Sequence, residues 1–226
     1  MLGPVARNRI GAALLAAGSL TFLWYALSCL ASGSGCGIGR TFFVAPALGL
    51  MALHATLALG VWTGRAWARW MGIGVGFAWV LCTSLIACAA PPAVLLFAAL
   101  HAPLPLLLAR QDDIHGRTSL SLLLTGMALP LALSLGLGEL GLPAVSWALI
   151  AGSALVVFGA VGMARGRTWG LLLLGAAGLT YLSATTIDPI MLERQAFQIS
   201  GLVALPLLAA LVPFLKPMTA FLFPTR

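Results

Sequence analysis

Stretches of about twenty consecutive apolar residues recur along this chain, and they constrain its fold more than any other feature. Reading them between charged residues or Gly/Pro breaks places them near residues 10–31, 42–62, 70–89, 92–109, 118–137, 143–163, 169–187 and 197–215. The hydrocarbon core of a bilayer needs roughly 20 apolar residues per helix. These runs are apolar on every face, whereas the strands of a membrane barrel alternate. The sequence therefore predicts an all-α transmembrane bundle of about eight spans.

Composition supports lipid as the solvent. Hydrophobic residues make up 61% of the 226 positions and charged residues 8%, and the mean hydropathy is +1.07. Soluble domains use about 25% charged residues, so too little polar surface is present here to coat a globule in water. The net charge of +7 does not indicate a nucleic-acid partner, because the basic residues are dispersed between the spans.

Positive charges assign the orientation of the predicted spans. Alternate loops and termini divide the basic residues ten against two, with only Arg40 and Arg194 in the smaller set. Cytoplasmic loops of inner-membrane proteins carry the excess of Lys and Arg, so both termini are expected in the cytoplasm. The larger set consists of Arg7, Arg9, Arg65, Arg69, Arg110, Arg117, Arg165, Arg167, Lys216 and Arg226.

Two segments of the chain resemble each other at a nearly constant offset. Gly64-Arg65-Ala66-Trp67 recurs as Gly166-Arg167-Thr168-Trp169, 102 residues later, and Leu104-Pro105-Leu106-Leu107 recurs from Leu205, 101 residues later. Because four spans is an even number, the second unit enters the membrane in the same orientation as the first. We expect two parallel four-helix repeats, residues 1–112 and 113–226, within one integrated membrane domain.

Small residues and prolines within the spans predict local features of the packing. The pairs Gly60-x-x-x-Gly64 and Gly72-x-x-x-Gly76 each place two glycines on one helical face, which is typical of close helix contacts in membranes. Prolines within the spans should kink their helices, and these are Pro46, Pro103, Pro105, Pro130, Pro206 and Pro213.

Ionisable residues within the hydrocarbon are costly and therefore mark functional sites, yet few are present. None of the five acids lies near the middle of a span, which weakens an ion-driven transport mechanism. His54 and His101 remain, at depths of about 18 Å and 14 Å if each residue rises about 1.5 Å from the outer end of its span. Two facing imidazoles in a four-helix bundle can ligate a haem iron axially, and haem b at His54 and His101 is one expectation.

The arrangement is similar to that of haem A synthase, whose eight spans form two four-helix halves with haem-ligating histidines. The resemblance is one of topology and implies a haem site at His54 and His101. This chain departs from the pattern, because the duplicate positions, near 155–156 and 202–203, hold leucine and valine, and no acid accompanies His54. The alternative is that each neutral imidazole only hydrogen-bonds a neighbouring hydroxyl or carbonyl.

Other candidate residues lie near the outer ends of the spans. Cys29, Cys36 and Cys88 fall on the same predicted side, where a periplasmic disulfide is permitted, although the sequence does not choose the pairing. The seventh span is the most polar, so if the chain binds a small polar ligand, we expect the site at the outer end of this span, near Thr180, Tyr181, Ser183 and Thr185. No metal site is expected, since Asp112-Asp113-x-His115 supplies too few ligands for a closed shell.

These features predict a class of protein rather than an activity. We expect a non-catalytic subunit, assembly factor or partner-binding component of the inner membrane, with lipid and another membrane protein or a second copy as partners. A haem-binding redox protein and a transporter of a neutral or lipidic solute through the interface of the two halves are the alternatives. No catalytic residue is assigned, because no serine or cysteine has a base at a spacing that sequence can specify.

Overall fold

The computed structural model describes residues 3–31, 40–86, 92–109, 116–142, 146–187 and 197–215, and in these residues the chain is helical without strands. The predicted all-α class is therefore confirmed for this part of the chain. Each predicted span contains helix. The bounds are α1 (Pro4–Ala31), α2 (Arg40–Trp62), α3 (Ala66–Ile86), α4 (Pro92–His101), α5 (Leu104–Leu108), α6 (Gly116–Glu139), α7 (Trp147–Ala164), α8 (Trp169–Ile187), α10 (Phe197–Ala209) and the 3₁₀ helix η1 (Val212–Phe214).

Helix length and composition are compatible with a membrane protein. Among the described residues, four helices are long and apolar enough to cross a membrane: Pro4–Ala31, Phe42–Trp62, Gly116–Glu139 and Trp147–Ala164. Shorter apolar helices cover Phe97–Leu108, Trp169–Ala184 and Ser200–Phe214. Many large apolar side chains are exposed on the outside of the bundle, among them Leu106, Phe158 and Leu205. Such a surface suits hydrocarbon rather than water.

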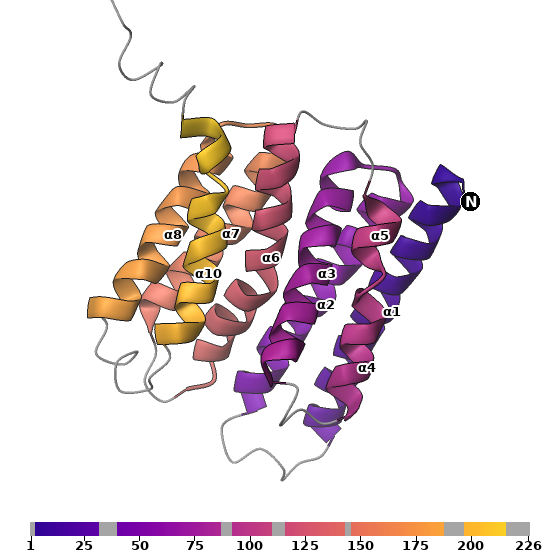
Figure 1. Ribbon diagram of the computed structural model, residues 1–226. Coiled ribbons are helices and arrows are strands. Elements are labelled where there is room, and N and C mark those ends of the chain that lie inside the picture. The colour runs from indigo at the N-terminus through magenta and orange to yellow at the C-terminus, as the bar shows by residue number, and fades with distance from the viewer. Residues whose placement is uncertain are drawn as a thin grey trace, which may run out of the picture.

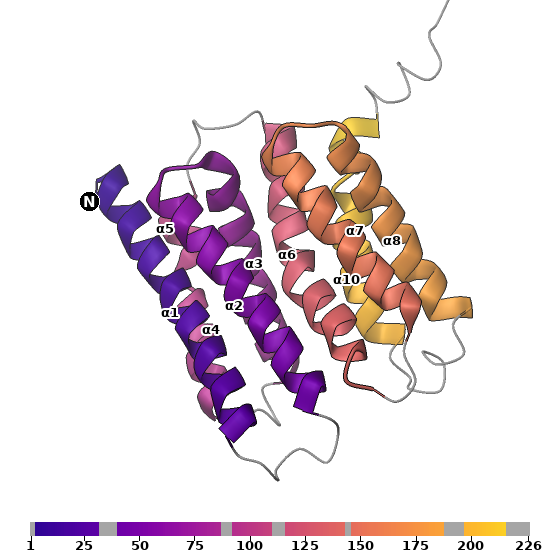
Figure 2. The same ribbon diagram turned by 180° about the vertical axis from the view of Figure 1, so that it is seen from behind.

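The helices gather into two groups. Figure 1 shows α1 to α5 on one side and α6 to α10 on the other, and Figure 2 shows the same grouping from behind. The groups meet where α6 packs against α3 and α2. The predicted boundary between the repeats, after residue 112, lies outside the described residues.

Glycines bring the backbones of α3 and α6 into direct contact at this junction. A Cβ added at Gly74 would lie 2.8 Å from Met127 N and closer still to Leu123 O. A Cβ at Gly126 would lie 2.8 Å from Met71 Cα and closer still to Met71 O. No side chain separates the two helices at these points, so dispersion contacts between backbones hold the two groups together.

The fourth predicted span is broken rather than kinked. α4 ends at His101, and α5 begins at Leu104 after Ala102 and Pro103. Pro103 and Pro105 have no amide hydrogen, so the carbonyls four residues earlier receive no helical hydrogen bond and the helix stops. Gly76 of α3 packs against the break, since a Cβ there would lie 3.1 Å from His101 O. Pro46, Pro130 and Pro206, by contrast, lie inside continuous helices.

The turns after α2 and α7 have the same hydrogen bonds. Gly64 (φ 73°) and Gly166 (φ 66°) adopt left-handed conformations. In the first turn Gly64 N donates to Val61 O at 3.0 Å and Arg65 N donates to Gly60 O at 2.8 Å. This is the Schellman arrangement, in which a glycine after the helix end satisfies the last carbonyls. The prediction that Gly64 packs on a helical face was wrong, because Gly64 lies beyond α2 and meets nothing within 4 Å.

A buried carboxylate joins the end of α6 to the start of α7. Glu139, the last residue of α6, is buried and accepts a hydrogen bond from Ser146 N at 2.7 Å. Ser146 is the N-cap of α7. A negative charge beside unsatisfied amides at a helix start is favourable, so Glu139 stabilises the hairpin.

Exposed hydroxyls along the helices bond to their own backbones. Thr21 Oγ1 donates to Ala17 O at 2.9 Å, Thr56 Oγ1 to Ala52 O at 2.8 Å, and Ser84 Oγ to Val80 O at 2.7 Å. Each acceptor lies four residues earlier, on the preceding helical turn. The donor of each hydroxyl is therefore satisfied without water or a neighbouring helix.

Candidate functional site

His54 and His101 meet in the interior of the first helix group. The haem expectation required the two rings to face each other, and their Nε2 atoms lie 3.1 Å apart. Both side chains are fully buried. His54 comes from the middle of α2, and His101 ends α4 at the proline break. Gly18 of α1 leaves room for both rings, since a Cβ there would lie 2.9 Å from His54 Cδ2 and 3.0 Å from His101 Nε2.

The other nitrogen of each ring contacts the carbonyl one turn earlier on its own helix. His54 Nδ1 lies 2.8 Å from Leu50 O, and His101 Nδ1 lies 2.9 Å from Phe97 O. A carbonyl oxygen only accepts, so each Nδ1 carries the hydrogen if these are hydrogen bonds. Trp79 Nε1 of α3 also donates to His54 Nε2, at 3.3 Å. His54 Nε2 therefore lies within hydrogen-bond distance of both Trp79 Nε1 and His101 Nε2.

Aromatic rings enclose the two imidazoles. Phe22 lies 5.2 Å from the His54 ring, Phe97 lies 4.3 Å from the His101 ring, and Trp79 lies 6.3 Å from each, measured between centroids. Sequence analysis missed these three residues and Gly18, because aromatic and small residues within apolar spans are ordinary core residues. Among these four residues, only Trp79 could have been found from the sequence. It lies 102 residues before Tyr181, which is the offset between the two similar segments.

The enclosure does not match a haem site. Axial bonds of about 2.0–2.1 Å on opposite sides of one ion separate the two nitrogens by about 4 Å, whereas these nitrogens lie 3.1 Å apart. The macrocycle would also need the space that the rings of Phe22, Trp79 and Phe97 surround. In this arrangement the two rings would have to separate before haem could enter, so haem ligation stays a prediction without geometric support.

The residues of the predicted polar pocket on α8 do not point into one cavity. Tyr181 is fully buried, and its hydroxyl lies 2.7 Å from Ser153 Oγ and 3.4 Å from Ala132 O. Thr180 is half-buried and Ser183 is exposed, and both border a surface depression of about 630 Å³ together with Leu179 and Leu182. The side chain of Thr185 lies outside the described residues. Tyr181 is thus a packing contact between α8, α7 and α6.

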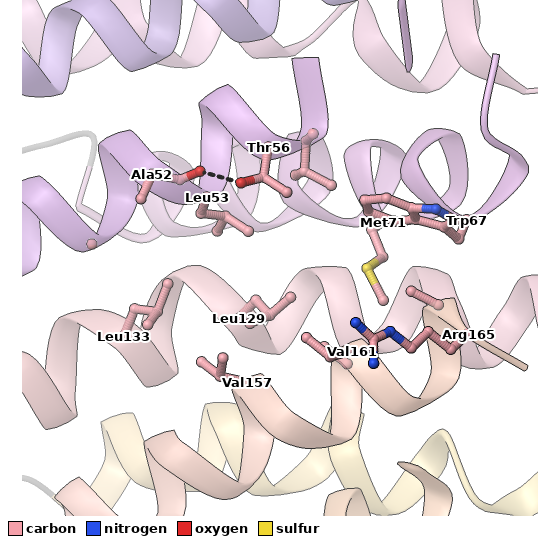
Figure 3. A pocket seen from close by; sticks show the side chains of 14 residues that line it. Ala52, Leu53, Thr56, Trp67, Met71, Leu129, Leu133, Val157, Val161 and Arg165 are labelled. Carbon is pink, nitrogen blue, oxygen red and sulfur yellow. Dashed lines mark hydrogen bonds between the residues drawn. The ribbon is translucent and has the colours of Figure 1, made fainter. Parts of the chain in front are cut away.

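A groove opens between the two helix groups. It has a volume of about 570 Å³ and lies between α2 and α3 on one side and α6 and α7 on the other. Figure 3 shows the Arg165 guanidinium pointing into one end of it, near Met71. Thr56 lines it too, but its hydroxyl donates to Ala52 O. The lining is otherwise apolar apart from the Trp67 indole nitrogen, and comprises Gly49, Ala52, Leu53, Thr56, Leu57, Trp67, Met71, Leu129, Leu133, Val157, Ala160, Val161, Ala164 and Arg165.

The predicted disulfide and the loop acids fall mainly outside the described residues. Cys36, Cys88, Asp112, Asp113 and His115 are among the residues for which no structure is described. Cys29 is half-buried in the last turns of α1. The disulfide therefore stays a prediction. Within the described ranges, no cluster of three or more His, Cys, Asp or Glu side chains could hold a metal ion.

No known family model, curated protein or solved structure matches this chain. The similarity to haem A synthase therefore remains one of expected topology. What the protein does has to be argued from the His54–His101 pair and from the groove.

Proposed function

We propose that the chain is a non-catalytic, eight-span protein of the inner membrane that binds a lipidic molecule in the groove between two parallel four-helix repeats. The observation that carries the proposal is the groove itself. An apolar space bordered by both helix groups would be filled by hydrocarbon in a bilayer. In this proposal the protein binds a partner molecule, as a non-catalytic membrane component would. The molecule is lipidic, as was expected of a transporter, but it need not be carried across the membrane.

Local geometry supports the duplication. The second turn repeats the hydrogen bonds of the first, with Gly166 N donating to Met163 O at 3.0 Å and Arg167 N donating to Gly162 O at 2.9 Å. Each donor and each acceptor lies 102 residues after its counterpart. Packing repeats as well, since a Cβ at Gly60 would meet Trp67 at 3.3 Å and one at Gly162 would meet Trp169 at 2.7 Å.

The arrangement of the ends supports a cytoplasmic location for both termini. The start of α1, the α2–α3 turn and the α7–α8 turn lie at one end of the bundle in Figures 1 and 2. Arg9 of α1 lies over the Trp62 ring of α2, with 5.6 Å from Cζ to the ring centroid. The basic residues of these segments therefore share one end, which the positive-inside rule assigns to the cytoplasm.

Charge at that end favours an anionic headgroup for the bound molecule. Arg165 is exposed and borders the groove, so its guanidinium can donate hydrogen bonds to a phosphate while acyl chains follow the apolar lining. Anionic lipids concentrate in the cytoplasmic leaflet, on the side where Arg165 is proposed to lie. We therefore take the ligand to be an anionic phospholipid.

Native mass spectrometry after purification in mild detergent tests this proposal. The wild type should retain one anionic phospholipid per chain. Ala52→Trp should fill the groove and release the lipid, whereas Ala55→Trp should not, because Ala55 is exposed on the same helix but does not border the groove. Arg165→Gln should remove the preference for anionic over zwitterionic lipid, with Arg167→Gln as its control. Equal retention in all four variants, or no lipid on the wild type, would contradict the proposal.

A further inference from the structure

The groove between the two helix groups has a buried back and an exposed rim. Leu57, Met71 and Leu129 form the back, and their side chains are buried. Ala52 of α2 and Val161 of α7 lie on the rim and are exposed at the surface of the bundle. The open side therefore faces the space that lipid is proposed to occupy, so a hydrocarbon chain can enter the groove sideways from the bilayer.

The lining residues give the length of the groove. They run from Gly49 to Leu57 on α2 and from Val157 to Arg165 on α7, which is eight positions on each helix. At about 1.5 Å per residue, each helix borders the groove over about 12 Å. One leaflet contributes about 15 Å of hydrocarbon, half of the roughly 30 Å core of a bilayer. The groove is therefore nearly as long as the acyl chains of one leaflet are deep.

The volume of the groove fits one acyl chain rather than two. At roughly 30 Å³ for each methylene, close to the volume of a water molecule in the liquid, a groove of about 570 Å³ holds about nineteen carbons. A single chain of a common membrane lipid has fewer carbons than this, and two such chains together have more. One chain of a phospholipid can therefore lie in the groove, and a second chain has no room there.

Leu137 of α6 closes the end of the groove opposite the guanidinium. Leu137 lies one helical turn beyond Leu133, which lines that end (Figure 3). Gly49 of α2 packs directly against Leu137, because a Cβ added at Gly49 would collide with Leu137 Cδ1. On the same side of Leu133, α6 also packs against α2 at Gly138, where a Cβ would lie 3.5 Å from Phe42 Cε2. A chain that enters beside the guanidinium therefore ends at Leu137.

We propose that the groove binds a single acyl chain and that Leu137 limits the length of this chain. The inference rests on the proposed function and narrows its ligand. The anionic headgroup lies at Arg165, one chain fills the groove, and any second chain stays in the bilayer. A lysophospholipid, which has one acyl chain, should therefore bind about as well as the two-chain lipid with the same headgroup.

Competition between a two-chain and a one-chain lipid tests how many chains the groove holds. Phosphatidylglycerol and lysophosphatidylglycerol with the same acyl chain are added in equal amounts to delipidated protein in detergent, and native mass spectrometry measures the bound fraction of each. The lysolipid should bind at least about a third as well as the two-chain lipid. Weaker binding of the lysolipid would show that the protein holds both chains, and would overturn the inference.

A series of lysophosphatidylglycerols of increasing chain length tests the role of Leu137. Binding to the wild type should increase with chain length up to a limit and then decline. Leu137→Ala removes carbons from the closed end and leaves a cavity, so the limit should move to chains about three carbons longer. Leu133→Phe should fill part of the groove and move the limit to shorter chains. Leu135→Ala is the matched control, because Leu135 is half-buried on the same helix but does not border the groove.

The outcomes separate this inference from the proposed function. Gel filtration must show each variant monodisperse, and the two groove variants move the limit in opposite directions, so either one alone tests the inference. Binding of both lipids without a length limit, or with the wild-type limit in Leu137→Ala and Leu133→Phe, would overturn the inference and leave the lipid site standing. If neither lipid bound the wild type, the proposed lipid site itself would be wrong.

Discussion

Gly74→Ala should weaken the junction between the two helix groups. The added methyl would lie 2.8 Å from Met127 N, where ordinary contact begins at 3.4 Å, so α3 and α6 must separate locally by at least about 0.6 Å. Neither obstacle can rotate away, because Met127 N and Leu123 O both belong to the α6 backbone. Overpacking of this kind costs about 1–3 kcal/mol. We expect that loss in the free energy of unfolding, measured in mixed micelles by titration with a denaturing detergent.

Gly201→Ala is the matched control. Gly201 lies inside α10, and a Cβ there would meet nothing within 4 Å. Alanine is intrinsically the better helix former by up to about 1 kcal/mol in water, so this variant should be as stable as the wild type or more stable. If both variants had the same stability, direct backbone contact would not hold α3 against α6, and the junction described above would be wrong.

Two further predictions concern buried polar contacts of the second helix group. Glu139→Ala should lower the free energy of unfolding by about 1.5–3 kcal/mol, the usual contribution of a hydrogen bond to a charged group, because the amide of Ser146 loses its acceptor. A thermal scan in detergent checks this, and an unchanged midpoint would refute it. Tyr181→Phe should cost about 0.6–1.7 kcal/mol, the range for hydrogen bonds between membrane helices. A double-mutant cycle with Ser153→Ala measures the coupling, and zero coupling would show that the 2.7 Å contact contributes nothing.

The positions of the helices were predictable because the length of the apolar runs and the charged breaks between them determine where each helix begins and ends. Regions near 42–62, 118–137 and 143–163 became α2, α6 and α7 with small changes at their ends. The break after His101 was harder, since a proline within a span is compatible with either a kink or an interruption. Pro46 and Pro130 were accommodated within continuous helices. What distinguishes the break is a second proline two residues later, which removes a further amide.

Similar depths made a pairing of His54 with His101 one of two open expectations, and the environment of the pair was not predictable. When a span is apolar on every face, its polar and apolar residues do not alternate with the helical period, so the sequence does not show which face is buried. Phe22 and Trp79 therefore could not be assigned to the histidines in advance. The same difficulty placed Tyr181 among the residues of a ligand pocket, although its hydroxyl is used in packing. The interface of the two halves was considered only as a route for a transporter, and the sequence did not identify the residues that line the groove.

Hydroxyls that donate to the backbone of their own helix affect which substitutions the chain can tolerate during evolution. Thr21, Thr56 and Ser84 each donate their hydroxyl hydrogen to their own helix, so replacing one of them by valine or alanine leaves the described hydrogen bonds between helices intact. Substitutions at Thr21 and Ser84 should therefore be nearly neutral for folding, whereas Thr56 also lines the groove. An exposed threonine on such a helix therefore does not indicate that water is nearby. The helix can gain or lose such residues without changing the helices packed against it.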